Sequence, residues 1–338
     1  MSSANKKLIV TISTLIILLA AVFLIFKNYK TEISRVSAVK FGVTFTKARA
    51  EYLGLNWRDV YLSILDELKV RYLRISAYWP EIETEKDSYN FSDLDWLIDE
   101  AGSRQVKIIL AVGQRLPGWP ECHIPEWAKN LSEGQQQEKI LDLIKETVNY
   151  YKPQPQIWAW QLENEPFLNT FGICPPPDRK FFEKELALIK SLDNRPIIVT
   201  ESGELSTWIN GGRYGDILGI TIYRAVWNKY LKYFYHPWPA VSYYLKGKLV
   251  KFFTGVPKII VVELQGEPWY PSGSPLTTPL DEQFKTMNLE RLKNTVNYAR
   301  QTGFEQFYLW GAEWWYWLKQ NSHPEIFNYT QELFKSQL

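Results

Sequence analysis

The sequence predicts a single (β/α)8 barrel behind an N-terminal transmembrane helix. Short apolar runs, typical of parallel strands buried on both faces, alternate with helical patterns along most of the 338 residues. After the first 35 or so residues, about 300 remain, which suits one barrel of eight βα units. An open doubly wound sheet usually has a Gly-rich turn after its first strand, whereas here the first strand runs into Thr46–Arg49.

Eight segments have the length and apolar character of barrel strands. They are Phe41–Phe45, Tyr72–Ser76, Lys107–Val112, Ile157–Leu162, Pro196–Thr200, Ile217–Tyr223, Lys258–Leu264 and Gln306–Trp310. The segments between them carry apolar residues at three- and four-residue spacing, which predicts helices. These helices are Trp57–Leu68, Leu94–Ala101, Gln137–Tyr151, Arg179–Leu192, Tyr243–Phe253, Asp281–Gly303 and Pro324–Phe334.

The N-terminal prediction depends on Leu8–Phe26, a run of 19 residues without a charge. As a helix this run would be about 28 Å long, close to the thickness of a bilayer core. No convincing cleavage site follows it, which favours an uncleaved anchor over a signal peptide. We therefore expect residues 1–35 to be a membrane anchor with a polar linker, and residues 36–338 to be an extracytoplasmic catalytic domain. Cleavage of the anchor would make the protein secreted.

The charge balance gives no reason to expect a nucleic-acid partner, because 39 Lys and Arg face 37 Asp and Glu. The aromatic content, with 15 Trp, 20 Tyr and 17 Phe, is high. Most of these rings must pack in the core, but those in the Pro-rich loops after the third, fourth and sixth strands would lie on the active-site face of a barrel.

Two predicted strands each deliver a carboxylate at their C-terminal end. The fourth ends in Asn164-Glu165-Pro166, where proline cannot continue the ladder. The seventh carries Glu263 after a run of isoleucine and valine. A carboxylate in a barrel mouth is costly unless it has a partner or a task, so Glu165 and Glu263 are the candidate catalytic residues.

The segments WQLENEP (160–166) and VVELQ (261–265) resemble the acid/base and nucleophile strands of glycoside hydrolase clan A. Residues 89–96, YNFSDLDW, also resemble a segment after strand two of that clan. This resemblance extends from Phe41 to about Trp317. It implies a retaining β-glycosidase on a (β/α)8 barrel, similar to the cellulase-like family 5 and β-galactosidase-like family 42 enzymes, with an oligo- or polysaccharide substrate.

The same resemblance implies roles for further residues. Glu165 would be the acid/base and Glu263 the nucleophile. Arg74, an arginine inside an apolar strand, would hold Glu263 ionised. Asn164 would bind the sugar 2-hydroxyl, Tyr223 would position the nucleophile, and Trp310 would form the floor of the sugar subsite.

Two departures from the clan pattern concern the substrate more than the mechanism. The sixth strand has Thr221-Ile222-Tyr223 in place of His-x-Tyr, and the seventh has Glu-Leu-Gln in place of Glu-Trp-Gly or Glu-Phe-Gly. Two alternatives stay open: a transglycosylase that remodels surface glycans, and a non-catalytic carbohydrate-binding barrel.

The two cysteines, Cys122 and Cys174, lie in Pro-rich loops. If those loops follow adjacent strands, a disulfide is plausible and would indicate an oxidising compartment; otherwise both are unpaired core residues. The histidines His123, His236 and His323 are scattered, so we expect no metal site and no cofactor.

Overall fold

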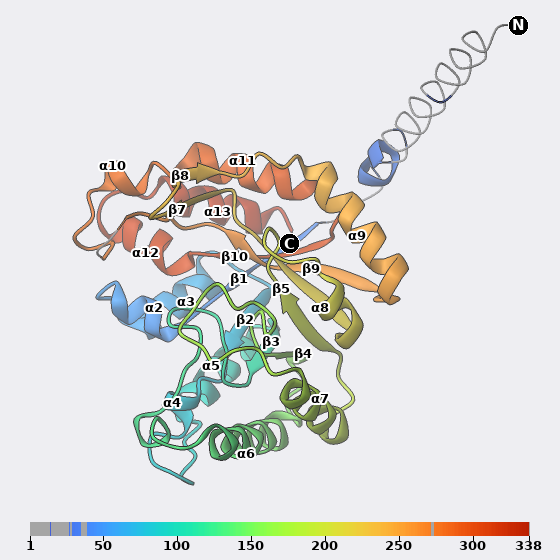
Figure 1. Ribbon diagram of the computed structural model, residues 1–338. Coiled ribbons are helices and arrows are strands. Elements are labelled where there is room, and N and C mark those ends of the chain that lie inside the picture. The colour runs from blue at the N-terminus through green and yellow to red at the C-terminus, as the bar shows by residue number, and fades with distance from the viewer. Residues whose placement is uncertain (1–13, 15–26, 28, 35–38, 272–273, 338) are drawn as a thin grey trace, which may run out of the picture.

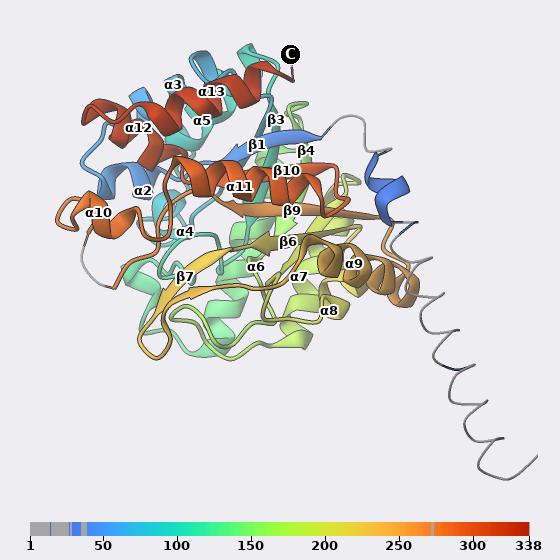
Figure 2. The same cartoon turned by 90° about the horizontal axis from the view of Figure 1, so that it is seen from above.

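Eight parallel strands close into a barrel that helices surround, as the computed structural model shows for residues 14, 27, 29–34, 39–271 and 274–337 (Figure 1, Figure 2). The barrel strands are β1 (Lys40–Thr44), β2 (Tyr72–Ser76), β3 (Lys107–Val112), β4 (Ile157–Leu162), β5 (Ile197–Glu201), β6 (Ile217–Ile222), β9 (Lys258–Gln265) and β10 (Gln306–Trp310). Each pairs with its neighbours in chain order, and β10 closes onto β1. The predicted (β/α)8 barrel is therefore confirmed.

Most of the helices cover the outside of the barrel. They are α2 (Lys47–Tyr52), α3 (Trp57–Asp66), α4 (Trp79–Ile82), α5 (Ser92–Ser103), α6 (Glu133–Tyr151), α7 (Arg179–Leu192), α8 (Ile209–Tyr214), α9 (Ala240–Thr254), α10 (Leu280–Gln283), α11 (Leu289–Arg300), α12 (Ala312–Gln320) and α13 (Glu325–Lys335), with a short 3-10 turn at Glu126–Ala128. The segment predicted as one helix over Asp281–Gly303 is two, because the Asn288 side chain accepts a hydrogen bond from Arg291 N and starts α11.

A small antiparallel hairpin follows β6 and was not predicted. It consists of β7 (Ala225–Asn228) and β8 (Lys232–Tyr235), and its strands pair with each other. It lies in one of the aromatic-rich loops that the sequence places at the C-terminal end of the barrel.

Alternate strand residues divide the core into two layers. Those facing outward pack against the helices; those facing inward form a separate cluster within the barrel. The inner cluster contains Ile109, Ala159, Ile198, Ile217, Ile260, Val262 and Tyr308. Arg74 lies in β2 between the outward-facing Leu73 and Ile75, so its side chain belongs to the interior.

Strand β9 contains a one-residue bulge beside the candidate nucleophile. Against β6, Ile220 pairs with Val261, but the next residue, Thr221, pairs with Glu263. The pairing of β9 with β10 shifts over the same stretch. Such bulges redirect a side chain near an active site, and this one brings Glu263 into the barrel mouth directly after the inward-facing Val262.

Residues 29–34, expected to be part of a polar linker, are helical and pack on α9 (Figure 1). The Tyr29 and Tyr244 rings lie 5.3 Å apart, and Glu32 pairs with Lys248 at 2.7 Å. Apart from Thr14, the apolar run Leu8–Phe26 lies outside the described residues, so the predicted anchor does too. Within the part of the chain that the structure describes, every helix is too short or too polar to cross a bilayer.

Candidate active site

The two candidate catalytic carboxyl groups lie at the same end of the barrel. Glu165 lies three residues after the end of β4 at Leu162, and Glu263 is near the end of β9. Parallel strands bring their C-terminal ends to one face, where loops form the site. Both side chains are buried, and the charge of Glu263 is one cause of the raised pKa of Glu165. The structure thus brings together the residues that the sequence selected.

Arg74 connects most of this site. Its side chain is fully buried; Nη1 donates to Glu263 Oε1 at 2.8 Å, and Nη2 donates to Asn164 Oδ1 at 2.8 Å. Its Nε donates to Gln161 Oε1 at 2.7 Å. A buried guanidinium requires an anion and several acceptors, and these partners meet both needs. Arg74 therefore fixes the Glu263 carboxylate and the Asn164 amide relative to each other.

The second oxygen of Glu263 is also held by a donor. The Tyr223 hydroxyl donates to Glu263 Oε2 at 2.8 Å. Burial, followed by the negative charge of Glu263, raises the pKa of Tyr223 well above its ordinary value, so the phenol stays protonated. Glu204 holds the backbone of this tyrosine by accepting from Tyr223 N at 2.8 Å. Each oxygen of Glu263 is therefore held by a donor, one from Arg74 and one from Tyr223.

Glu165 has a different environment. Thr221 Oγ1 donates a long hydrogen bond to Glu165 Oε1 at 3.4 Å. Its backbone is fixed by donation from Glu165 N to Thr200 Oγ1 at 2.7 Å, with φ at 48°. Burial, followed by the charges of Glu263 and Glu121, raises the pKa of Glu165 well above its ordinary value. Both effects favour the protonated form of this carboxyl group.

Trp310 ends β10 and lies half-buried at the rim of the barrel. Its Nε1 donates to Glu267 Oε1 at 2.9 Å, and Arg49 donates to Glu267 Oε2 through Nε at 3.0 Å and Nη2 at 2.9 Å. Glu267 thus anchors the indole ring at the rim of the barrel.

A row of aromatic rings continues from Tyr223 toward solvent. Ring centroids are 5.6 Å apart between Tyr223 and Trp269, 6.0 Å between Trp269 and Phe171, and 6.1 Å between Phe171 and Trp119. Trp119 at the outer end is 67% exposed. Flat rings in such a row are suited to packing against the C–H faces of sugars.

The family model for glycoside hydrolase family 42, described as beta-galactosidase, matches residues 56–234, more than half of the chain. The chain belongs to glycoside hydrolase family 42. No curated protein sequence matches it.

Solved structures similar to this family 42 protein share its barrel. A GH5_18 protein from Streptomyces cattleya, in complex with GlcNAc, is 14% identical with a TM-score of 0.55, over 81% of this chain and 70% of its own. A beta-galactosidase from Halorubrum lacusprofundi is 13% identical with a TM-score of 0.54, over 80% and 52%. Xylanase 10B from Thermotoga petrophila, in complex with xylobiose, is 13% identical with a TM-score of 0.54, over 83% and 84%. At these identities the likeness concerns the fold. Together with the family match, it makes this protein a glycoside hydrolase.

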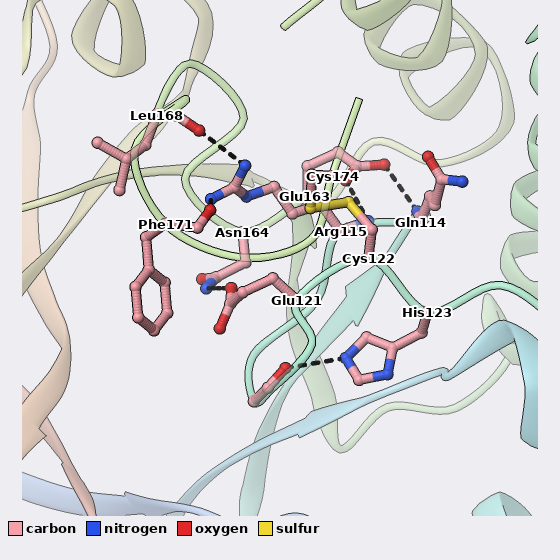
Figure 3. Close-up of a disulfide and its surroundings, with 11 residues drawn as sticks. Gln114, Arg115, Glu121, Cys122, His123, Glu163, Asn164, Leu168, Phe171 and Cys174 are labelled. Atoms are coloured by element: carbon pink, nitrogen blue, oxygen red, sulfur yellow. Dashed lines mark hydrogen bonds between the residues drawn. A yellow bond between two sulfur atoms is a disulfide. The ribbon is translucent and has the colours of Figure 1, made fainter. Parts of the chain in front are cut away.

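Sequence reasoning missed one carboxyl group beside this candidate site, that of Glu121. This buried side chain accepts from Asn164 Nδ2 at 3.1 Å, as the dashed line in Figure 3 shows. Burial, followed by the negative charge of Glu263, raises its pKa to about 8. The only sequence signal was an acidic residue directly before Cys122 in a loop of the active-site face.

The loop that carries Glu121 is tied to the loop after β4. Cys122 and Cys174 form a disulfide with an S–S distance of 2.03 Å (Figure 3). Arg115 donates to the carbonyl oxygens of Leu168 at 2.7 Å and Phe171 at 2.9 Å. The disulfide expected from the two Pro-rich loops is therefore present, and it fixes the position of Glu121.

Other acidic residues near strand ends have structural partners. Glu163 accepts from the backbone N of Gln114 and of Arg115, at 2.8 and 2.6 Å. Glu201 accepts from Gly211 N at 2.8 Å, and Glu313 accepts from Thr46 N at 2.7 Å. Across the described ranges, no group of His, Cys, Asp and Glu is arranged to hold a metal ion.

Proposed function

We propose that this glycoside hydrolase is a retaining β-glycosidase, with Glu263 as nucleophile and Glu165 as acid/base. The observation that supports this proposal most is the contrast between the two groups in one site. One carboxylate has a donor on each oxygen, whereas the other is desolvated and has a raised pKa. A retaining mechanism requires this pairing of an ionised nucleophile with a protonated acid.

In the first step, Glu263 attacks the anomeric carbon while Glu165 gives its proton to the departing glycosidic oxygen. Arg74 and Tyr223 hold the attacking carboxylate in position. The products of this step are the released alcohol and a glycosyl ester on Glu263.

In the second step Glu165 changes from acid to base, and the loss of charge on Glu263 explains this change. Its negative charge is one cause of the raised pKa of Glu165, second after burial. The ester has no such charge, so the pKa of Glu165 falls once the intermediate forms. Glu165 can then take a proton from the water that releases the sugar.

The substrate side of the proposal is a β-linked oligo- or polysaccharide. Trp310 would support the sugar undergoing attack, and Asn164, held by Arg74 and Glu121, would hydrogen-bond a hydroxyl beside the anomeric centre. The row from Tyr223 to Trp119 would bind the rest of the chain on the leaving side. An acceptor sugar on the same rings would favour transglycosylation, which remains the second candidate function.

Two measurements test the catalytic assignment. A 2-fluoro-β-galactoside or 2-fluoro-β-glucoside with an activated leaving group should label Glu263, as read by peptide mass spectrometry. Glu165→Ala should lower turnover roughly 10²- to 10⁴-fold, and azide should restore part of it with an activated substrate. Glu163→Ala is the control, because its backbone contacts predict lower stability without azide rescue. Labelling of another residue, or no azide effect on Glu165→Ala, would contradict the assignment.

For the cellular location, we propose an extracytoplasmic catalytic domain held at a membrane by the run Leu8–Phe26. The disulfide between Cys122 and Cys174 supports an oxidising compartment. The uncharged run itself supports the anchor. Co-fractionation of the full chain with membranes after carbonate washing tests the anchor, and recovery in the soluble fraction would argue for a cleaved segment.

A further inference from the structure

Helix α9 presents large apolar side chains to solvent along its outer side. Leu245, Leu249, Phe252 and Phe253 are 37%, 57%, 81% and 66% exposed, and we call these four residues the α9 face. Their spacing places them on one stripe of the helix. The opposite side of α9 is also apolar, since Tyr243, Tyr244, Gly247 and Val250 are buried against the barrel. A helix that is apolar on both sides indicates a partner for the outer side.

Lysines accompany the α9 face. Lys248 and Lys251 are both exposed between the apolar residues of the same helix, and Lys248 also pairs with Glu32. Leucine and phenylalanine combined with lysine are typical of helices that lie in the interfacial layer of a bilayer, with the rings among the acyl chains and the ammonium groups at anionic lipid phosphates.

The position of residues 29–34 ties this face to the apolar run at the N-terminus. Tyr29 packs on Tyr244, its hydroxyl donates to Gln301 O at 2.8 Å, and Glu32 pairs with Lys248. Tyr29 comes three positions after Phe26, the last residue of the uncharged run. Three residues span at most about 10 Å, so α9 cannot lie far from the end of that run.

We propose that the α9 face rests in the interfacial layer of an anionic lipid bilayer and orients the barrel on the membrane. The orientation has a consequence for the active site. Helix α9 ends just before β9 begins, so Phe252 and Phe253 lie toward the N-terminal end of the barrel strands. Glu165 and Glu263 lie at the opposite end. The catalytic mouth therefore lies at the end of the barrel remote from Phe252 and Phe253, where glycans can reach it.

The test uses the full chain reconstituted in vesicles of phosphatidylcholine and phosphatidylglycerol that contain acyl-chain spin-labelled lipid. A fluorophore is attached to a cysteine introduced as Phe252→Cys. The matched control is Tyr230→Cys, because Tyr230 is also 81% exposed but lies in the hairpin between β7 and β8, away from α9 (Figure 1). Contact with lipid predicts quenching at position 252 roughly threefold or more above that at position 230.

A second variant separates lipid contact from other causes. Leu249→Glu with Phe253→Glu, in the Phe252→Cys background, should reduce quenching to the Tyr230→Cys level. Its melting temperature and glycoside hydrolysis should not change, because both positions are exposed and distant from the barrel mouth. Equal quenching at positions 252 and 230, or no association of the full chain with vesicles, would overturn the proposal. So would self-quenching at position 252 that depends on protein concentration and not on lipid, since it would identify a second copy as the partner.

Discussion

The two carboxyl groups of the site differ in what surrounds them, although both end barrel strands. Around Glu263 the protein supplies donors: a fully buried arginine on one oxygen and a tyrosine hydroxyl on the other. Around Glu165 it supplies burial and like charge, with Thr221 Oγ1 at the edge of hydrogen-bonding range. One barrel mouth thus surrounds one carboxyl group with donors and buries the other beside negative charge. The contrast teaches that partner choice, more than position along a strand, distinguishes a nucleophile from an acid.

The largest expected effect comes from removing the cation on the Glu263 side. Arg74→Met would leave the carboxylate buried without its counter-ion and the Asn164 amide without its main donor. Breaking a buried ion pair in this way costs about 3–5 kcal/mol of unfolding free energy. We expect kcat/KM to fall at least about a hundredfold as well, because the nucleophile loses alignment and charge. Urea unfolding and steady-state kinetics measure the two effects.

Arg71→Met provides the matched control for this change. Arg71 directly precedes the same strand, but its side chain is exposed and donates to the Arg104 carbonyl oxygen. The control should retain nearly all stability and activity. Similar losses in both variants would mean that the contrast between the two carboxyl groups does not depend on Arg74.

The next largest effect concerns the covalent link on the Glu165 side. Reduction of Cys122–Cys174 releases a loop with a sequence separation of 52 and frees the segment that positions Glu121. Such links contribute roughly 2–4 kcal/mol to unfolding free energy. The melting temperature should therefore fall on treatment with a thiol reductant. The double variant Cys122→Ala, Cys174→Ala should start at the lower value and not respond to the reductant; a response there would show that the reductant acts elsewhere.

The barrel and the Glu263 side could be predicted from sequence because they follow simple patterns. Predicted and observed bounds coincide for Tyr72–Ser76, Lys107–Val112, Ile157–Leu162 and Gln306–Trp310, where apolar runs are sharply bounded. Arg74 lies inside an apolar strand, and a buried arginine needs an anion, so the sequence also predicted its carboxylate partner. Loop geometry could not be predicted in this way. Glu121 reaches Asn164 through a loop whose path depends on a disulfide and on carbonyl partners far along the chain.

The bulge in β9 shows a second limit of sequence patterns. Strict alternation from the inward-facing Ile260 and Val262 would direct Glu263 outward, into the layer between barrel and helices. The register shift between Val261 and Glu263 reverses this direction, and the strand sequence has no residue that marks it. The sequence analysis selected Glu263 because it lies at the strand end and because its segment resembles the clan A nucleophile strand. The direction of its side chain played no part.

A smaller effect is expected from the second donor on the nucleophile. Tyr223→Phe removes one hydrogen bond to a charged carboxylate while it keeps the ring that packs near Trp269. Such a bond contributes about 1.5–3 kcal/mol, so kcat/KM should fall roughly ten- to a hundredfold. Tyr235→Phe is the control, because its hydroxyl donates to the Lys285 carbonyl oxygen in the hairpin region. Equal activity in the Tyr223 variant and the control would remove Tyr223 from the set that positions Glu263.

The smallest and most specific effect is a change in pH dependence on the Glu165 side. The pKa of Glu121 is raised to about 8 by burial and by Glu263, and the charge of Glu121 in turn raises the pKa of Glu165. Glu121→Gln removes this charge, so the alkaline limb of the kcat/KM profile should move to lower pH. Glu126→Gln, an exposed change nearby in the chain, should leave the limb in place. A limb that does not move would show that Glu121 affects the site through structure alone.

Glu121→Gln should also change how the unfolding free energy depends on pH. A buried acid such as Glu121 stabilises the fold at low pH, whereas a salt-bridged acid does so at high pH. Because the folded-state pKa of Glu121 lies above its ordinary value of 4.5, the folded protein binds this proton more tightly than the unfolded chain does. Wild-type unfolding free energy should therefore fall as pH rises from about 4.5 to about 8, whereas Glu121→Gln lacks this contribution. The variant should lose less stability than wild type between pH 5 and pH 9, by up to a few kcal/mol. Wild type and Glu121→Gln could instead lose the same unfolding free energy between the two pH values, as measured by urea unfolding. That result would mean that solvent or neighbouring groups compensate the burial of Glu121 and that its pKa is not raised.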